Sequence, residues 1–216
     1  MTLELGVLCS GEGTNFSAVL DACEQGSLDA RVALVLCNRA EAGCLERARR
    51  RGVKALALDH RAYADRERYD EALAGALRDA GVSFVVLAGF MRIVGAPLLQ
   101  AFPDRVLNLH PSLLPAFPGV DALGQALAHG VAWTGCTVHL VDAGTDTGPI
   151  VAQAVVPILE GDTRESLAER VRGAEHETLV EALRWFSRGA VRVVRGAGRA
   201  RVEVSAATRA RRGGER

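Results

Sequence analysis

An asparagine and a histidine stand two residues apart at the end of an apolar run, in the segment Asn108-Leu109-His110-Pro111. Side chains alternate along a strand, so a strand that ends here turns Asn108 and His110 to the same side. An amide donor beside an imidazole can stabilise developing negative charge and move a proton. Pro111 disfavours the helical region for His110, which predicts an extended chain up to the histidine. The alternative is a buried turn whose histidine only satisfies its own hydrogen bonds.

Two segments flank this pair with features of a binding loop. Pro115 predicts an extended Leu114, and the bond between them is a candidate for the cis form. Residues 142–149 form an acidic loop with Asp142, Asp146 and two glycines, between two strand-like runs. Taken alone, such a loop is typical of a hairpin connection. The carboxylates of Asp142 and Asp146 are therefore candidate site residues, and the loop alone assigns them no role.

A glycine turn, Ser10-Gly11-Glu12-Gly13-Thr14-Asn15, separates an apolar run from an amphipathic segment. A strand, a glycine turn and a helix make a site for a phosphate, because backbone N–H groups at the helix start favour an anion. The dinucleotide fingerprint would need a third glycine where Phe16 stands, and the lysine of the P-loop is missing. A monophosphate site and a simple tight connection both remain open at this point.

Composition limits the classes of protein that the chain could belong to. Its 216 residues are 49% hydrophobic and 24% charged, which suits one globular domain. The formal net charge is 0, so we expect neither a nucleic-acid partner nor an anionic membrane. No signal peptide or long apolar run is visible, which predicts a cytoplasmic location. The five cysteines are odd in number and form no CxxC pair, which argues against zinc and redox motifs, and Cys9 and Cys37 are expected in the core.

Short apolar runs alternate with amphipathic segments over the first half of the chain. Strands are expected at residues 3–8, 32–37, 53–58, 84–88 and 106–110. Helices are expected at residues 16–24, 42–50 and 66–80, with a shorter one near Pro97. This order predicts an α/β fold with a doubly wound, mostly parallel sheet and flanking helices. Right-handed crossovers would then place the glycine turn and His110 at one rim of the sheet.

The second half continues with fewer and longer elements. We expect a helix at residues 122–128 and strands at 135–141, 150–157 and 191–194. Asp162 and Glu165 predict a capping box for a long helix that ends at Ser187. Glu175 and His176 on this helix are equally candidates for the surface and for a site.

The segment 195–216 carries seven arginines against Glu203 and Glu215. A solvated, partly ordered tail is the main interpretation, and a nucleic-acid arm is the alternative. We therefore predict one domain at residues 1–194, followed by an Arg-rich C-terminal tail at 195–216 that is not a separate domain.

Together these segments resemble the folate-dependent glycinamide ribonucleotide formyltransferases of purine synthesis. The resemblance covers residues 3–194. It rests on the glycine turn, on Leu-Ala-Gly-Phe-Met-Arg-Ile at 87–93, and on Asn-Leu-His-Pro-Ser-Leu-Leu-Pro at 108–115 with Phe117-Pro118-Gly119. Val-His-Leu-Val-Asp at 138–142 and Asp146-x-Gly148-Pro149 complete it. The proline-containing run alone is shared by relatives that act on other amines, whereas the whole set is more specific.

The resemblance implies a Rossmann-like formyltransferase fold and a role for each matching residue. The reaction would move a formyl group from 10-formyltetrahydrofolate, a co-substrate, to the amine of glycinamide ribonucleotide in the purine pathway, with no metal, in a monomer or homodimer. The catalytic residues would be Asn108, His110 and Asp146. The ribonucleotide would bind through Gly13, Thr14, Asn15 and Glu175. The folate cleft would be lined by Arg66, Met91, Arg92, Ile93, Val94, Asn108, Asp142, Ala143, Gly144, Thr145 and Asp146.

One departure and three rival functions bear on this interpretation. Family members usually carry histidine where this chain has Asp121, which leaves open how that loop meets the substrates. A formyltetrahydrofolate deformylase would need an additional N-terminal domain, for which a first strand at Leu3 leaves no room. A methionyl-tRNA formyltransferase would need a basic C-terminal domain longer than the arginine tail. A non-catalytic anion-binding module would use the glycine turn and give no reason for the Asn108, His110 and Asp146 set.

Overall fold

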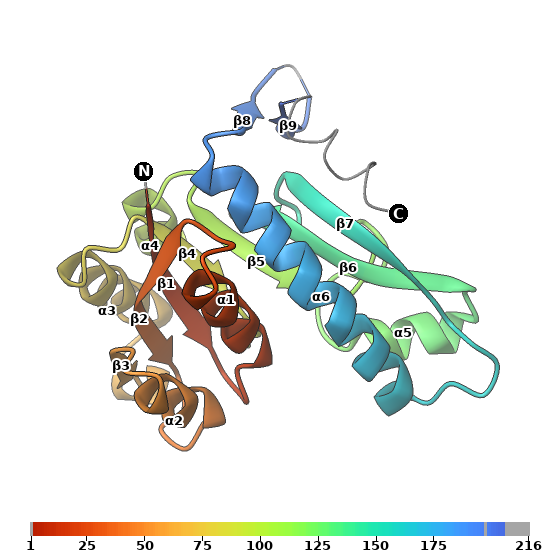
Figure 1. The fold of residues 1–216 in the computed structure, drawn as a ribbon, viewed down its shortest axis with the longest axis horizontal. Helices are drawn as coiled ribbons and strands as arrows, with labels where there is room; N and C mark the ends of the chain where they lie inside the picture. The colour runs from red at the N-terminus through yellow and green to blue at the C-terminus, as the bar shows by residue number, and fades with distance from the viewer. Residues whose placement is uncertain (1, 197, 206–216) are drawn as a thin grey trace.

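One sheet of seven strands runs through the centre of the molecule in this computed structural model, which describes residues 2–196 and 198–205 (Figure 1). Its strands are β1 (Leu3–Cys9), β2 (Ala30–Cys37), β3 (Ala55–Ala57), β4 (Phe84–Leu87), β5 (Val106–His110), β6 (Trp133–Leu140) and β7 (Ile150–Pro157). The spatial order is β3-β2-β1-β4-β5-β6-β7. The first five strands pair in parallel, and β6 and β7 are added in antiparallel fashion. The mostly parallel sheet that the sequence predicts is confirmed.

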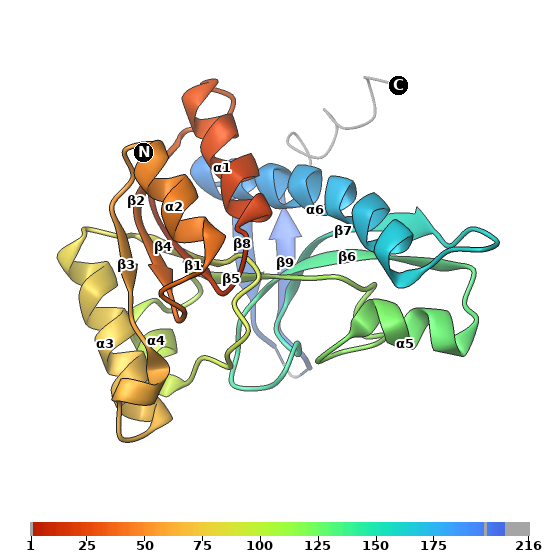
Figure 2. The ribbon, with the colours of Figure 1, turned by 90° about the horizontal axis from the view of Figure 1, so that it is seen from below.

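Helices cover both faces of the sheet (Figure 2). One face packs against α1 (Thr14–Glu24), α2 (Gly43–Arg50) and α6 (Arg164–Ser187), and the other against α3 (Arg66–Asp79) and α4 (Ala96–Ala101). Consecutive strand residues therefore enter different cores, as Val7 and Leu8 of β1 do. A short 3-10 turn, η1 (His60–Ala62), and α5 (Ala122–His129) complete this part of the chain. Two buried faces explain why the strands read as continuous apolar runs.

The strand order reverses between β1 and β4, and two hydrogen bonds join the loops that follow these strands. Ser10 N donates to Gly89 O over 3.1 Å, and Met91 N donates to the Ser10 hydroxyl over 2.8 Å. Ligands of open α/β sheets bind at the carboxyl ends of the strands where the order reverses. The glycine turn, the 89–94 segment and the end of β5 therefore share one edge of the sheet, as the sequence predicts.

The cap of α6 differs from the sequence prediction by one residue. Thr163 and Ser166, rather than Asp162 and Glu165, form the capping box. The Asp162 carboxylate instead accepts from Leu159 N over 2.8 Å and from the Arg170 guanidinium over 2.7 Å. Its oxygens close the preceding turn, so the next residue caps the helix.

The C-terminal part contains one strand that the sequence prediction missed. β8 (Val191–Val194) was expected, and β9 (Arg201–Val204) pairs with it as an antiparallel ribbon. The interpretation of residue 195 onward as a solvated tail is therefore wrong for β9, whose Val204 is buried against the main core. Residues 206–216 lie outside the described residues, and the division into a domain and a tail stays a prediction.

The cysteines lie mostly inside the molecule. Cys9 and Cys37 are buried in the core as predicted, together with Cys44 and Cys136, and Cys23 is partly buried. Within the described part of the chain, none of the five cysteines forms a disulfide bond. Over the part of the chain that the structure describes, no helix is both long and apolar enough to cross a membrane.

Candidate active site

β5 positions Asn108 and His110 on one side of the sheet, as strand alternation predicts. Asn108 pairs with His139 of β6 in the antiparallel register, and its Nδ2 lies 3.1 Å from His139 Nε2. His139 Nδ1 faces the carbonyl oxygen of Leu140 at 2.9 Å, which fixes the orientation of the ring. The amide of Asn108 is thus held by a buried imidazole on the neighbouring strand.

Both ring nitrogens of the buried His110 face acceptors. Nε2 lies 2.9 Å from the carbonyl oxygen of Phe117, and Nδ1 lies 3.4 Å from Oδ2 of Asp146. A doubly protonated imidazole donates at both nitrogens and satisfies both partners. Both ring nitrogens of His110 are therefore placed to donate a hydrogen bond.

Asp146 is the point at which the candidate catalytic groups meet. Its Oδ1 lies 3.4 Å from Asn108 Nδ2 and 3.5 Å from His139 Nε2. Its Oδ2 accepts from Gly119 N over 2.8 Å and faces His110. Asp146 thus contacts both of the other residues that the resemblance implies as catalytic, Asn108 and His110. Long contacts of 3.4 Å are common in catalytic sites without substrate and tighten when it binds.

The loop between β6 and β7 is shaped so that Asp146 can turn back toward β5. Asp146 has a positive φ of 54°, and the Asp142 carboxylate accepts from Gly144 N over 3.0 Å and from the Thr147 hydroxyl over 2.6 Å. A Cβ added at Gly148 would lie 1.7 Å from the carbonyl oxygen of Leu140, so only glycine fits there. The acidic loop is therefore a preorganised support for one carboxylate and not merely a hairpin connection.

Opposing influences act on the pKa of Asp146. Burial is the largest and by itself raises the pKa. The contact with His139, the Gly119 N–H and the positive charge of His110 together lower it by more, so the pKa lies below its ordinary value. Asp146 is therefore ionised at neutral pH and is a weak base there.

The segment after β5 is pinned to the antiparallel strands. The Thr137 hydroxyl of β6 donates to Ser112 O over 2.7 Å and accepts from Leu114 N over 3.0 Å. Gln153 of β7 donates to Leu114 O over 3.0 Å. The Leu114–Pro115 bond is cis, the form for which the sequence makes it a candidate. These bonds fix the start of the loop that presents Phe117 O and Gly119 N to the site.

The glycine turn leads into α1 in the manner of an anion site. Gly13 is the N-cap with φ 74°, and no side chain caps the helix. The first turn holds no acidic residue, and its backbone N–H groups have no helical acceptor. Across this turn, Asn15 Nδ2 donates to Oε2 of Glu175 over 3.3 Å, which brings α1 and α6 together. Two of the residues that the resemblance implies for the ribonucleotide, Asn15 and Glu175, are thus in contact.

Burial governs the ionisation of Glu175. Desolvation raises the pKa of its carboxyl above the ordinary value, against the lowering by the Asn15 amide and the charge of Arg172. Its neighbour His176 has a pKa lowered by burial first and by Arg172 second. The pKa values of Glu175 and Asp146 are therefore shifted in opposite directions.

The segment expected to line the folate cleft lies at the same edge of the sheet. Met91 and Ile93 are large apolar side chains with 68% and 56% of their surface exposed, whereas Val94 is buried in the core. Val94 can therefore offer a ligand only its backbone. The buried Asp70 of α3 accepts from Gly95 N over 2.6 Å and holds the end of this segment. Burial raises the pKa of Asp70, against the Gly95 N–H and the charges of Arg66 and Arg92.

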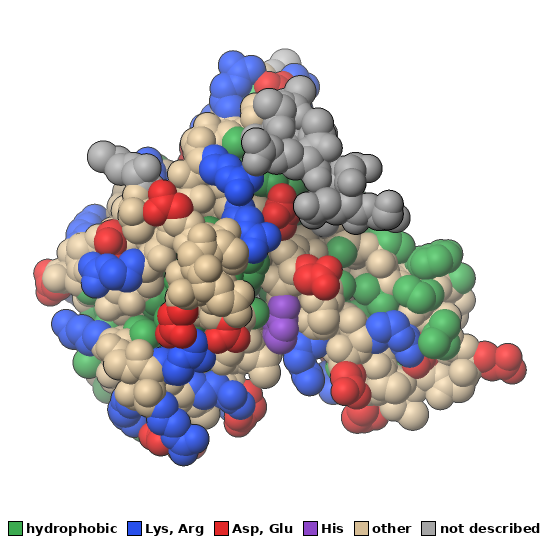
Figure 3. Space-filling view, viewed as in Figure 1, with side chains coloured by type: hydrophobic (Ala, Val, Ile, Leu, Met, Phe, Trp, Pro, Cys, Tyr) green, Lys and Arg blue, Asp and Glu red, His purple; other side chains and the backbone are tan. Residues whose placement is uncertain are grey.

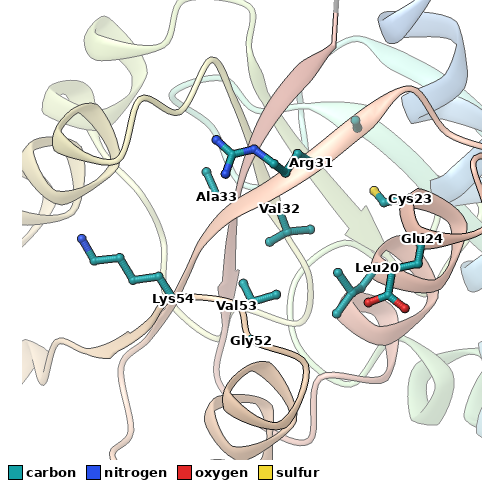
Figure 4. A pocket seen from close by; sticks show the side chains of 10 residues that line it. Leu20, Cys23, Glu24, Arg31, Val32, Ala33, Gly52, Val53 and Lys54 are labelled. Carbon is teal, nitrogen blue, oxygen red and sulfur yellow. The ribbon is translucent and has the colours of Figure 1, made fainter.

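The surface is hollowed in at least two places, and the hollow whose lining residues are known lies away from the candidate groups. In Figure 3 the molecule is notched between the part that carries α1 and α2 and the part that carries α5. A separate hollow of about 670 Å³ lies among the end of α1 and the starts of β2 and β3, where Leu20, Val32 and Val53 converge (Figure 4). It lies at the amino ends of the strands, away from Asn108 and His110, and none of the candidate site residues lines it.

The sequence interpretation missed two residues that shape the site. His139 was expected to have no catalytic role, and it contacts both Asn108 and Asp146. Asp70 was not noted, although it is buried and holds Gly95. Neither role follows from spacing along the chain, because each depends on which strand or loop lies next to it. Within residues 2–196 and 198–205, no group of three or more His, Cys, Asp and Glu side chains is arranged to hold a metal ion.

The chain is similar to proteins of one known family. The family model described as formyl transferase matches residues 4–183, which is most of the chain. The chain belongs to the formyl transferase family. Family membership agrees with the fold and with the resemblance that the motifs carry.

Individual relatives of this formyl transferase point the same way. The phosphoribosylglycinamide formyltransferase of Bacillus subtilis is 41% identical over 81% of the chain and 89% of its own length. The trifunctional purine biosynthetic protein adenosine-3 of Drosophila pseudoobscura pseudoobscura is 44% identical over 88% of the chain, which spans 14% of that longer protein. The crystal structure of glycinamide ribonucleotide transformylase 1 from Symbiobacterium toebii is similar with a TM-score of 0.90, at 53% identity and 94% coverage of both chains.

The raised pKa of Glu175 predicts a pH-dependent effect of Glu175→Gln on stability. The folded state binds the Glu175 proton more tightly than the unfolded chain, so ionisation destabilises the fold once the pH exceeds the unfolded pKa of about 4.3. The variant should therefore gain stability relative to the parent formyl transferase between about pH 4 and about pH 7. Urea unfolding midpoints at both pH values measure this gain. Glu177→Gln, an exposed carboxylate on the same helix, is the control, and an equal gain in both variants would contradict the assignment.

Proposed function

We propose that this chain transfers the formyl group of 10-formyltetrahydrofolate to the primary amine of glycinamide ribonucleotide, in purine biosynthesis. The observation that carries the proposal is the meeting of Asn108, His110 and Asp146 at the sheet edge that also carries the glycine turn. The names of the relatives at 41% and 53% identity support the same substrates. We further expect a cytoplasmic monomer or homodimer that acts on small molecules, without nucleic-acid or membrane partners.

The chemistry needs no nucleophile from the protein, because the substrate amine attacks the formyl carbon. A carbon–nitrogen bond forms, and the formyl oxygen becomes an oxyanion in a tetrahedral intermediate. The attacking nitrogen then loses a proton, N10 of the folate gains one, and the bond between the formyl carbon and N10 breaks. The site must therefore stabilise the oxyanion and pass a proton between two nitrogens.

Asn108 and His110 supply the donors for the oxyanion. The Asn108 amide has two N–H groups, and the one directed at Asp146 makes a long contact of 3.4 Å. His110 as an imidazolium also has a long contact of 3.4 Å at Nδ1. An oxyanion bound among these donors accepts strong, charge-assisted hydrogen bonds. The two long contacts to Asp146 are weak, so the donors can leave them for the oxyanion when substrate binds.

Asp146 acts through charge rather than as a strong base. Its pKa lies below the ordinary value because its partners outweigh burial, so it stays ionised while the reaction runs. A carboxylate close to His110 Nδ1 stabilises the protonated ring and orders a water that carries the proton between the nitrogens. This division of roles agrees with a partly buried carboxylate that has several donors around it.

The glycine turn and α6 bind the ribonucleotide. The open backbone N–H groups at the start of α1 receive the phosphate, with Gly13, Thr14 and Asn15 around it. Glu175, joined to Asn15, meets the glycinamide end. The folate lies along Arg66, Met91 to Val94 and the loop 142–146, where exposed Met91 and Ile93 offer apolar contact.

The direct test incubates the purified protein with labelled 10-formyltetrahydrofolate and each candidate amine. Transfer of label to glycinamide ribonucleotide, and not to methionyl-tRNA, is expected. Formate release at the same rate without any amine would identify a deformylase and contradict the proposal. Retention of all label on the folate would favour a binding module.

Substitutions at the three catalytic positions should lower turnover strongly while the fold persists. Asn108→Ala and His110→Ala each remove an oxyanion donor, which typically costs about a hundred- to a thousandfold in rate, or about 3–4 kcal/mol. Asp146→Asn removes the charge that holds the imidazolium. Asp104→Asn is the control, because Asp104 has a similar positive φ of 55° outside the site. Near-normal turnover of His110→Ala, with circular dichroism unchanged, would remove His110 from the mechanism.

Substitutions in the glycine turn should affect one substrate more than the other. Thr14→Val and Asn15→Ala remove hydrogen bonds to a charged phosphate, so the KM for the ribonucleotide should rise about ten- to a hundredfold. Asn15→Asp adds a negative charge at nearly the same volume and should be worse than Asn15→Ala. Steady-state kinetics with each substrate varied in turn measures the difference. An equal rise in both KM values would argue against a phosphate site here.

A further inference from the structure

The loop between Pro115 and α5 holds two of the proposed catalytic side chains by its backbone. Phe117 O accepts from His110 Nε2 over 2.9 Å, and Gly119 N donates to Asp146 Oδ2 over 2.8 Å. A small shift of this loop would therefore move or release both side chains. The position of the loop is part of the geometry of the site.

The same loop has a strained backbone. Phe117, Gly119 and Asp121 all have positive φ, at 52°, 80° and 55°. Glycine adopts a positive φ readily. A positive φ is unfavourable for phenylalanine and less unfavourable for aspartate. Residues held in this way keep their conformation only where surrounding contacts determine it. The loop must therefore be anchored from outside.

One anchor is an ion pair to the helix that carries Glu175. Arg164 Nε at the first turn of α6 donates to Asp121 Oδ1 over 2.7 Å. Gln125 of α5 adds a bond from its side chain to Val120 O over 2.8 Å. For the described residues 116–121, the Asp121–Arg164 contact is the one ion pair to another part of the chain. This ion pair connects the loop directly to α6, the helix that also carries Glu175.

We propose that Asp121 and Arg164 are a positioning pair that holds the 117–121 loop against His110 and Asp146. The carboxylate of Asp121 is directed at Arg164 and not at the candidate catalytic groups. The proposal rests on the proposed function for its kinetic readout. Its structural part, an anchored loop, does not depend on which amine is the substrate.

A double-mutant cycle tests the pair with Asp121→Asn, Arg164→Gln and their combination. Asparagine tolerates the positive φ of Asp121 and removes only the charge. Exposed ion pairs have modest effects, so each single variant should lower kcat about two- to fivefold. The double variant should be no slower than either single one, because both remove the same contact. The KM for the ribonucleotide should not change, because the loop does not touch the glycine turn.

Hydrogen exchange supplies a readout that is independent of activity. The Gly119 amide should exchange faster in Asp121→Asn and Arg164→Gln, because its bond to Asp146 opens more often. Glu203→Gln is the matched control, since the exposed pair Arg192–Glu203 has the same length of 2.7 Å and lies in the C-terminal ribbon. It should leave both kcat and exchange unchanged.

Two results would overturn the proposal. Losses in kcat that multiply in the double variant would show that Asp121 and Arg164 act separately, for example with Asp121 contacting substrate. Unchanged Gly119 exchange in both single variants would show that the pair does not hold the loop. If the parent protein transfers no formyl group to glycinamide ribonucleotide, the proposed function fails, while the exchange experiment still decides whether the pair anchors the loop.

Discussion

The partly buried carboxylate of Asp146 is the constraint around which the site is built. A buried charge is unfavourable unless charges and donors compensate it. Here the compensation comes from His110 and Asn108 on β5, His139 on β6 and the backbone of Gly119. These groups come from three separate segments, so satisfying one carboxylate fixes the relative positions of two strands and a loop.

The change from parallel to antiparallel pairing makes this arrangement accessible. Because β6 runs against β5, His139 lies directly beside Asn108, and the loop after β6 folds back toward His110. Glu175, which the proposed function assigns to the ribonucleotide, has one amide donor, and its pKa is raised whereas that of Asp146 is lowered. Two carboxylates with opposite shifts can take different roles within one site.

Much of the fold could be predicted from the sequence because these strands and turns depend on short-range patterns of residues. Alternation and the proline after His110 predicted β5 with its observed bounds, and the apolar run 150–157 did the same for β7. Glycine spacing predicted the turn before α1, which the structure shows at Gly13. β9 was missed because its four residues include only two apolar side chains, which bury little surface alone and form a strand only through pairing with β8.

The sequence by itself determined which side chains were available and which strand ends carried them. Asn108 and His110 were placed together by alternation, since side chains two apart share a face. Only the tertiary structure decided that Asp146, 36 residues beyond His110, turns back to meet them, and that His139 holds Asn108. It also decided that Asp121 meets Arg164. These contacts join segments far apart in the chain, and their energies depend on burial and strand pairing, which no local pattern encodes.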